Sequence, residues 1–153
     1  MNVLIVGGGK VGLHLATLLH TSGHGVKVIE VHSEHLADLR RTLPAGTVIA
    51  GSGSDPDVLE RAGVRQAQVV AAVTGADEIN LVVTSLARFE FHVARTIARV
   101  NNPKNTWLFT TEMGVDVALD QADLMAHLIV EEMSLGEMMT LLKLRKGQYA
   151  LVE

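Results

Sequence analysis

The sequence contains no cysteine, and this absence excludes several kinds of chemistry. Disulfide bonds, thiolate zinc sites and thiol nucleophiles all require cysteine sulfur. Because the reducing cytoplasm is the usual environment of chains without disulfides, we expect a cytoplasmic protein.

Long apolar runs and clusters of basic residues are also missing. No apolar run approaches the roughly 20 residues that cross a bilayer, and Met1-Asn2 leads directly into Val3-Leu4-Ile5-Val6 without the pattern of a secretory signal. The formal net charge is -4, whereas surfaces that follow nucleic-acid phosphates need clustered Lys and Arg. We therefore expect neither direct membrane insertion nor a nucleic-acid partner.

The apolar pattern predicts one α/β domain, and 153 residues suffice for a single core. Short β-branched runs alternate with segments of helical period, which is typical of βαβ units on a parallel sheet. We predict strands at residues 2–6, 26–31, 47–50, 69–73, 95–100 and 115–118. Six such strands indicate a Rossmann-type, doubly wound parallel sheet.

Helices are predicted between the strands, at residues 10–21, 33–43, 56–62, 77–89 and 104–112. Asp55-Pro56 supports one of these starts, because Asp accepts backbone N–H groups at a cap and Pro fits the first turn. Gly63 ends the same helix.

The segment 120–147 carries apolar residues on more than one face, and four of the six Met residues lie there. Methionine adapts to irregular partner surfaces, so we expect a dimerisation or domain-crossover helix. The alternative is a core helix and a second amphipathic helix separated at Gly136. Residues 148–153 resemble the beginning of a strand, which indicates the start of a missing or vestigial C-terminal domain.

A glycine-rich turn, Gly7-Gly8-Gly9-Lys10-Val11-Gly12, follows the first strand and opens the first helix. Gly7 permits the tight turn, Gly9 lets the backbone approach a pyrophosphate, and Gly12 lets the helix lie against the strand. Phosphates then bind free N–H groups at the helix N-terminus. Glu30 ends the second strand, where a carboxylate accepts hydrogen bonds from ribose hydroxyls and repels a 2′-phosphate. This context predicts an adenine dinucleotide or mononucleotide site.

Further candidate ligand contacts follow the other strands at the same edge. Lys10 can neutralise phosphate, although it is alternatively an ordinary surface lysine. Gly51-Ser52-Gly53 gives an adenine ring close access and a hydrogen bond from Ser52, although it is alternatively a plain turn. Thr74, Gly75 and Asn80 are candidates for ribose or the distal phosphate, although Thr74 and Asp77 also suit a helix cap. Arg99 suits either phosphate or an ion pair with an acid such as Glu131.

Recognisable catalytic and metal-binding patterns are missing. The seven histidines show no ligand spacing, and we assign them to the surface and to helix ends. No Ser/His/Asp order and no second substrate domain supports a dehydrogenase. We therefore expect a nucleotide-binding protein without catalytic activity and without a metal.

Five ordered motifs together resemble the RCK N-terminal (TrkA-N) domain, the cytoplasmic regulator of Trk/Ktr-type potassium uptake. They cover residues 3–12, 55–63, 72–81, 97–105 and 113–118. The resemblance spans residues 1–147 and implies residues 1–119 as the nucleotide-binding domain and residues 120–147 as the crossover segment. It also implies a homodimer or higher ring, attached to a membrane potassium-translocating subunit at the inner face of the cell membrane.

The resemblance places phosphates on the glycine turn, ribose on Glu30, adenine on Gly51 to Gly53, and the second half of the ligand on Thr74 and Asn80. Two departures bear on the ligand. The family often has Asp where this chain has Ser52, and Arg where it has Lys10. An Arg side chain binds a terminal phosphate bidentately, whereas Lys acts as a point charge. We expect NAD(H) or ADP/ATP as ligand, with NAD(H) or ADP favoured by Lys10. A regulator of a potassium efflux antiporter and an NAD-dependent oxidoreductase domain are the competing hypotheses.

Overall fold

Six parallel strands form the sheet of the protein, seen in a computed structural model that describes residues 1–149. The strands are β1 (Asn2–Val6), β2 (Gly25–Glu30), β3 (Val48–Ala50), β4 (Val69–Ala72), β5 (Arg95–Val100) and β6 (Val117–Asp120). Their spatial order is β3-β2-β1-β4-β5-β6, and every neighbouring pair is parallel. This is the doubly wound order of a Rossmann-type sheet, so the predicted fold class is confirmed.

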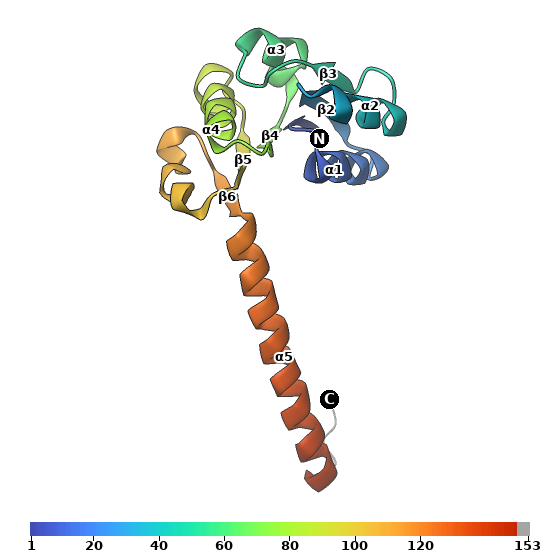
Figure 1. Cartoon of the computed structure of the whole chain (residues 1–153), viewed down its shortest axis with the longest axis vertical. Helices are drawn as coiled ribbons and strands as arrows, with labels where there is room; N and C mark the ends of the chain where they lie inside the picture. Colours follow the sequence, from blue (N-terminus) through green and yellow to red (C-terminus); the bar gives the residue numbers. More distant parts are fainter. Residues whose placement is uncertain (150–153) are drawn as a thin grey trace. The chain divides into compact units, whose positions relative to one another are not determined.

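Helices cover both faces of this sheet (Figure 1). They are α1 (Lys10–Thr21), α2 (Ser33–Thr42), α3 (Pro56–Arg61), α4 (Asp77–Ser85) and the short 3-10 helix η1 (Val64–Gln66). Alternate residues of β1 face opposite layers, as the two-residue period of a strand requires. Val3 and Ile5 pack with α1 and α2, whereas Leu4 and Val6 pack with α3 and α4.

The sequence prediction is wrong in the region after β5. A helix was expected at residues 104–112, but the chain forms two 3-10 helices, η3 (Pro103–Leu108) and η4 (Thr111–Met113). Phe109, between them, leaves the helical conformation and is buried with Val100 and Val115. Burial of this aromatic side chain therefore interrupts the helix.

Two other element ends also differ from the prediction. The helix expected at residues 77–89 is regular only to Ser85 and continues as the π-helix η2 (Leu86–Glu90). The last strand begins at Val117, two residues later than expected, because the Val115 N–H donates to the Thr110 carbonyl of the preceding turn.

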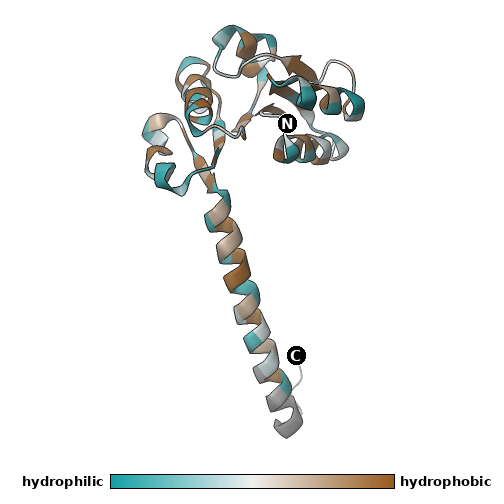
Figure 2. Ribbon diagram, viewed as in Figure 1, coloured by the Kyte–Doolittle hydropathy of each residue, from teal (hydrophilic) through white to brown (hydrophobic). Residues whose placement is uncertain are grey.

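A second compact unit begins at Gln121, after the first unit, Met1–Asp120. It contains α5 (Gln121–Tyr149), one helix that continues through Gly136, so the alternative of two helices separated there is wrong. Gln148 and Tyr149 end this helix, which corrects the strand predicted from residue 148; residues 150–153 lie outside the described part. Apolar residues recur along α5 among polar ones (Figure 2). Within residues 1–149, no helix combines the length and the apolar character needed to cross a bilayer.

Candidate functional site

A cavity of about 470 Å³ opens at the carboxyl edge of the sheet. It lies at the point between β1 and β4 where the strand order reverses, which is the place where doubly wound sheets bind ligands. Its lining includes eleven of the thirteen residues predicted from the sequence: Gly7, Gly9, Lys10, Val11, Glu30, Gly51, Ser52, Gly53, Thr74, Gly75 and Arg99. The two exceptions are Gly12 and Asn80. Segments far apart in the chain therefore form a single site.

Each of the three motif glycines of the turn is needed for a different steric reason. Gly7 has a φ of +109°, and a Cβ there would lie 2.9 Å from the Thr74 backbone nitrogen. At Gly12, a Cβ would overlap the Gly7 carbonyl group, so α1 can lie against β1 only with glycine. At Gly9, the nearest atom is His35 Cε1 at 3.6 Å, which leaves the backbone accessible from the cavity.

The N-terminus of α1 offers backbone donors to this cavity. The first turn of a helix leaves its N–H groups without intrahelical partners, and no side chain caps α1 at Gly9. The helix macrodipole places partial positive charge at the same point. Lys10 adds a mobile positive charge, because its side chain is exposed and lines the cavity. This end of the cavity is therefore suited to an anionic group.

Glu30 is buried at the end of β2, and its carboxylate accepts four hydrogen bonds. Oε1 accepts from the Gly8 N–H at 2.7 Å and from His35 Nδ1 at 3.1 Å, and Oε2 accepts from the N–H groups of Val31 and His32 at 2.7 and 2.8 Å. Burial raises the pKa of Glu30, but these hydrogen bonds outweigh it and hold the pKa below 4.5. The carboxylate is therefore ionised at neutral pH and opposes a second negative charge nearby.

Two histidines at the start of α2, a helix end as predicted, also belong to this site, and neither was predicted as a site residue. His32 and His35 both line the cavity, and their rings meet edge to face with centroids 5.6 Å apart. The signal that identifies them is their position: the start of α2 follows Glu30 directly, so its first turn lies at the same edge of the sheet.

Asn80 does not line the cavity, because its side chain is fully buried beneath it. Its Oδ1 accepts from Thr74 N and Thr74 Oγ1 at 3.0 and 2.7 Å, and its Nδ2 donates to the carbonyls of Thr74 and Arg99 at 3.1 and 2.9 Å. Every polar atom of the amide is therefore engaged within the protein, and the predicted contact of Asn80 with a ligand stays a prediction. Asn80 joins the ends of β4 and β5.

The interpretation of Thr74 and Asp77 as helix caps is wrong. Ala76 is the N-cap of α4, and no side chain caps it. Asp77 instead accepts hydrogen bonds from Asn101 N, Asn102 N and Asn105 Nδ2 at 2.6 to 2.9 Å. Burial raises the pKa of Asp77, but these hydrogen bonds lower it overall. Asp77 therefore ties α4 to the loop that follows β5.

Arg99 lines the cavity from the end of β5, and its buried Nε has no hydrogen-bond partner among residues 1–149. A buried guanidinium N–H without an acceptor is costly, so an anionic or carbonyl group from a ligand would stabilise it. The alternative ion pair with Glu131 stays a prediction.

The loop after β3 packs tightly against the rest of the site. A Cβ at Gly53 would overlap Val6 Cγ1 and lie 3.1 Å from Val83 Cγ2. Ser52 Oγ lies 2.7 Å from Ser54 Oγ, which holds the loop in shape. Small residues are therefore needed here for packing as well as for ligand access. Among residues 1–149, no three His, Asp or Glu side chains gather closely enough to hold a metal ion.

Comparison with known proteins gives matches along the whole chain. A family model described as the TrkA-N domain matches residues 3–121. The Trk system potassium uptake protein TrkA of Mycobacterium tuberculosis is 37% identical over 153 residues, which is 100% of this chain and 69% of that protein. The TrkA homolog of Methanothermobacter thermautotrophicus is 43% identical over 116 residues, 76% of this chain and 52% of that protein. The chain thus spans only part of the length of these relatives.

Solved structures share the fold at low sequence identity. The TrkA-N domain of the inner membrane protein ybaL from Escherichia coli has a TM-score of 0.73 at 21% identity and covers 85% of this chain and 94% of that one. The GsuK channel bound to NAD has a TM-score of 0.73 at 20% identity, over 89% of this chain and 24% of that one. GsuK bound to ADP has a TM-score of 0.70 at 21% identity, over 84% and 32%.

Proposed function

The chain belongs to the TrkA-N domain family, and from that membership we propose that it is a cytoplasmic, nucleotide-sensing regulatory subunit of a Trk/Ktr-type potassium transport system. The observation that carries the proposal is the cavity at the sheet edge, which combines the glycine turn, the ionised Glu30 and the unpartnered Arg99 Nε. Relatives named as Trk system potassium uptake proteins support the transport context.

The proposed ligand is NAD(H) or ADP/ATP, held by the residues that line the cavity. The α1 N-terminus and Lys10 would receive phosphate, Glu30 would receive the ribose hydroxyls, and the loop Gly51 to Gly53 would lie against adenine. Thr74, Gly75 and Arg99 would contact the second half of the ligand. The negative charge of Glu30 disfavours a ribose that carries a 2′-phosphate, so NADP is not proposed. NAD and ADP in the structures of GsuK are consistent with this choice.

Regulation, in this proposal, is a shift between two conformations of an assembly. A ligand shifts such an equilibrium only as far as its affinities for the two conformations differ. Binding alone is therefore enough to control a membrane partner, and we propose no catalytic step for this chain.

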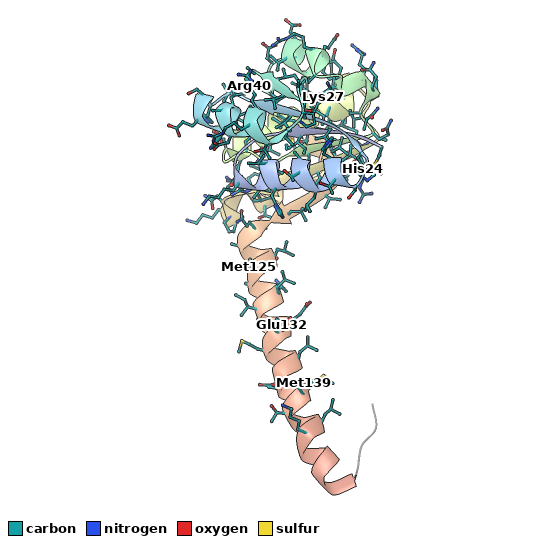
Figure 3. All side chains as sticks on the ribbon, turned by 90° about the vertical axis from the view of Figure 1, so that its right-hand side faces the viewer. His24, Lys27, Arg40, Met125, Glu132 and Met139 are labelled. Carbon is teal, nitrogen blue, oxygen red and sulfur yellow. The ribbon has the colours of Figure 1, made fainter. Side chains whose placement is uncertain are left out.

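Helix α5 supports assembly with a second copy or with a higher ring. Its exposed apolar side chains are Leu124, Met125, Leu128, Ile129, Val130, Met133, Leu135, Met138, Met139 and Leu142. One face of the helix carries both apolar and charged side chains. Residues seven positions apart lie on the same face, and Figure 3 shows Met125, Glu132 and Met139 at this spacing. Methionine adapts well to a partner surface, and we propose that α5 is the crossover segment of the assembly.

Calorimetric titration of the purified protein with NAD⁺, NADH, ADP and ATP tests the proposal. At least one nucleotide should bind, and Glu30→Ala should weaken its binding by about 1 to 3 kcal/mol, the usual value of hydrogen bonds to a charged group. Glu34→Ala is the matched control, because Glu34 is an exposed acid outside the cavity lining.

Equal affinities of wild type and Glu30→Ala would contradict the assignment of the ribose site, and absence of binding would contradict the function. Native mass spectrometry of the same sample reports the copurifying nucleotide and the number of subunits. Turnover in a hydride-transfer assay would instead support the oxidoreductase hypothesis.

A further inference from the structure

All four acceptor sites of the Glu30 carboxylate are occupied, so a ribose hydroxyl can bind it only if one of the present donors is replaced. An ionised carboxylate has about four lone-pair sites, two on each oxygen. Oε1 already accepts from Gly8 N and His35 Nδ1, and Oε2 accepts from Val31 N and His32 N. A ribose hydroxyl that donates to Glu30 must therefore replace one of these four donors.

Three of the donors are backbone groups whose positions depend on the fold. The Gly8 N–H belongs to the glycine turn, and the N–H groups of Val31 and His32 belong to the connection between β2 and α2. Moving any of them would disturb the turn or the start of the helix. The fourth donor is a side chain that can rotate. His35 is thus the donor that a ligand can replace without moving the backbone.

The geometry of His35 agrees with a replaceable contact. Its 3.1 Å distance to Oε1 is the longest of the four, and its side chain is 42% exposed, whereas that of Glu30 is 5% exposed. Because an ionised carboxylate only accepts hydrogen bonds, Nδ1 must carry the proton that it donates. The ring also lies beside the glycine turn, since its Cε1 is the nearest atom to a Cβ built on Gly9. His35 therefore stands between the turn and the carboxylate, on the lining of the cavity.

We propose that His35 is an intramolecular competitor for the ribose site: its imidazole occupies Glu30 in the empty protein and is displaced by the ribose hydroxyls of a bound nucleotide. This inference rests on the proposed nucleotide-binding function. His35 thereby lowers the affinity for any ribose-containing ligand and sets how strongly the site distinguishes ribose from deoxyribose.

Calorimetric titration with ADP and with 2′,3′-dideoxy-ADP tests the competition, because the two ligands share the phosphates and the base and differ only in the hydroxyls. In His35→Ala the affinity for ADP should rise about three- to tenfold, since the hydroxyls no longer displace a donor to a charged group. The affinity for dideoxy-ADP should stay within about twofold. The selectivity for ADP over dideoxy-ADP should therefore rise by about the same factor as the ADP affinity.

Two further variants complete the experiment. His35→Asn keeps an N–H donor at the place of Nδ1 and should restore a selectivity near that of wild type. His14→Ala, an exposed histidine of α1 outside the cavity lining, should leave both affinities unchanged. Equal melting temperatures of the variants would show that the fold is intact.

An unchanged selectivity in His35→Ala, or a loss of affinity for both ligands together, would overturn the competition, because His35 would then be a spectator or a direct contact. If wild type bound none of NAD⁺, NADH, ADP and ATP, the proposed function itself would be overturned, and the inference with it.

Discussion

Two glycine-to-alanine substitutions in the glycine turn, Gly12→Ala and Gly9→Ala, distinguish its contribution to stability from its contribution to nucleotide affinity. In Gly12→Ala, the new Cβ would lie 2.8 Å from the Gly7 carbonyl carbon and closer still to its oxygen. Carbon atoms in contact prefer about 3.5–4.0 Å, so α1 and the turn must separate by roughly 1 Å or more. Overpacking in a rigid core typically costs about 1–3 kcal/mol, and a clash between backbone atoms belongs at the upper end of this range.

In Gly9→Ala, by contrast, the new Cβ meets only His35 Cε1 at 3.6 Å, an ordinary contact, and the φ of Gly9 is -72°. The cost is the replacement of a glycine by alanine at an N-cap, about 1 kcal/mol or less. The added methyl group nevertheless lies on the surface that the phosphates would approach. Nucleotide affinity should therefore fall in both variants, whereas stability should fall strongly only in Gly12→Ala.

Thermal unfolding and calorimetric titration of both variants check this pair. For a domain of this size, a loss of 3 kcal/mol corresponds to a decrease of about 10 °C in Tm. If Gly12→Ala unfolded with the midpoint of wild type, the steric argument for the turn would be wrong. If Gly9→Ala bound nucleotide as wild type does, the phosphates would not lie on this turn.

Three further changes are predicted from the same contacts. Asn80→Ala leaves the Thr74 N–H and the Arg99 carbonyl without their side-chain partner and removes one of the two side-chain donors to the Thr74 carbonyl, which keeps Asn101 Nδ2. Urea unfolding should show a loss of about 2–4 kcal/mol in the free energy of unfolding, and a loss below about 0.5 kcal/mol would contradict this. Glu30 and Asp77 have lowered pKa values in the folded state, so the unfolded state binds more protons on acidification. The stabilisation that these two carboxylates provide is present above their unfolded pKa values of 4.5 and 3.8 and is lost as the pH falls through the folded ones. In Asp77→Asn the free energy of unfolding, measured with urea at several pH values between 7 and 3, should therefore decrease less with falling pH than in wild type. In Gly136→Ala the added Cβ would meet open space beyond the backbone of α5 itself, so alanine should stabilise α5 by about 0.5–1 kcal/mol. The variant should keep more of its helical circular dichroism on heating than wild type, and a lower helicity would refute an uninterrupted helix.

The sequence could predict those features that depend on neighbouring residues. The alternation of apolar runs predicted all six strands, and the glycine spacing predicted the turn, because strand period and the steric need for glycine are local properties. The order of a doubly wound sheet also follows from chain connectivity, which is why candidate residues from five separate segments were expected at one edge.

The tertiary structure alone decided how those residues share their hydrogen bonds. Asn80 became a support for Thr74 and Arg99, because burial requires every polar atom of its amide to be paired. Glu30 acquired His35 as a hydrogen-bond partner, since the first turn of α2 follows the end of β2. The helix expected at residues 104–112 was interrupted so that Phe109 could be buried. Sequence spacing places a side chain on an element and at an edge of the sheet, but its partners come from distant segments and are known only when the chain is folded.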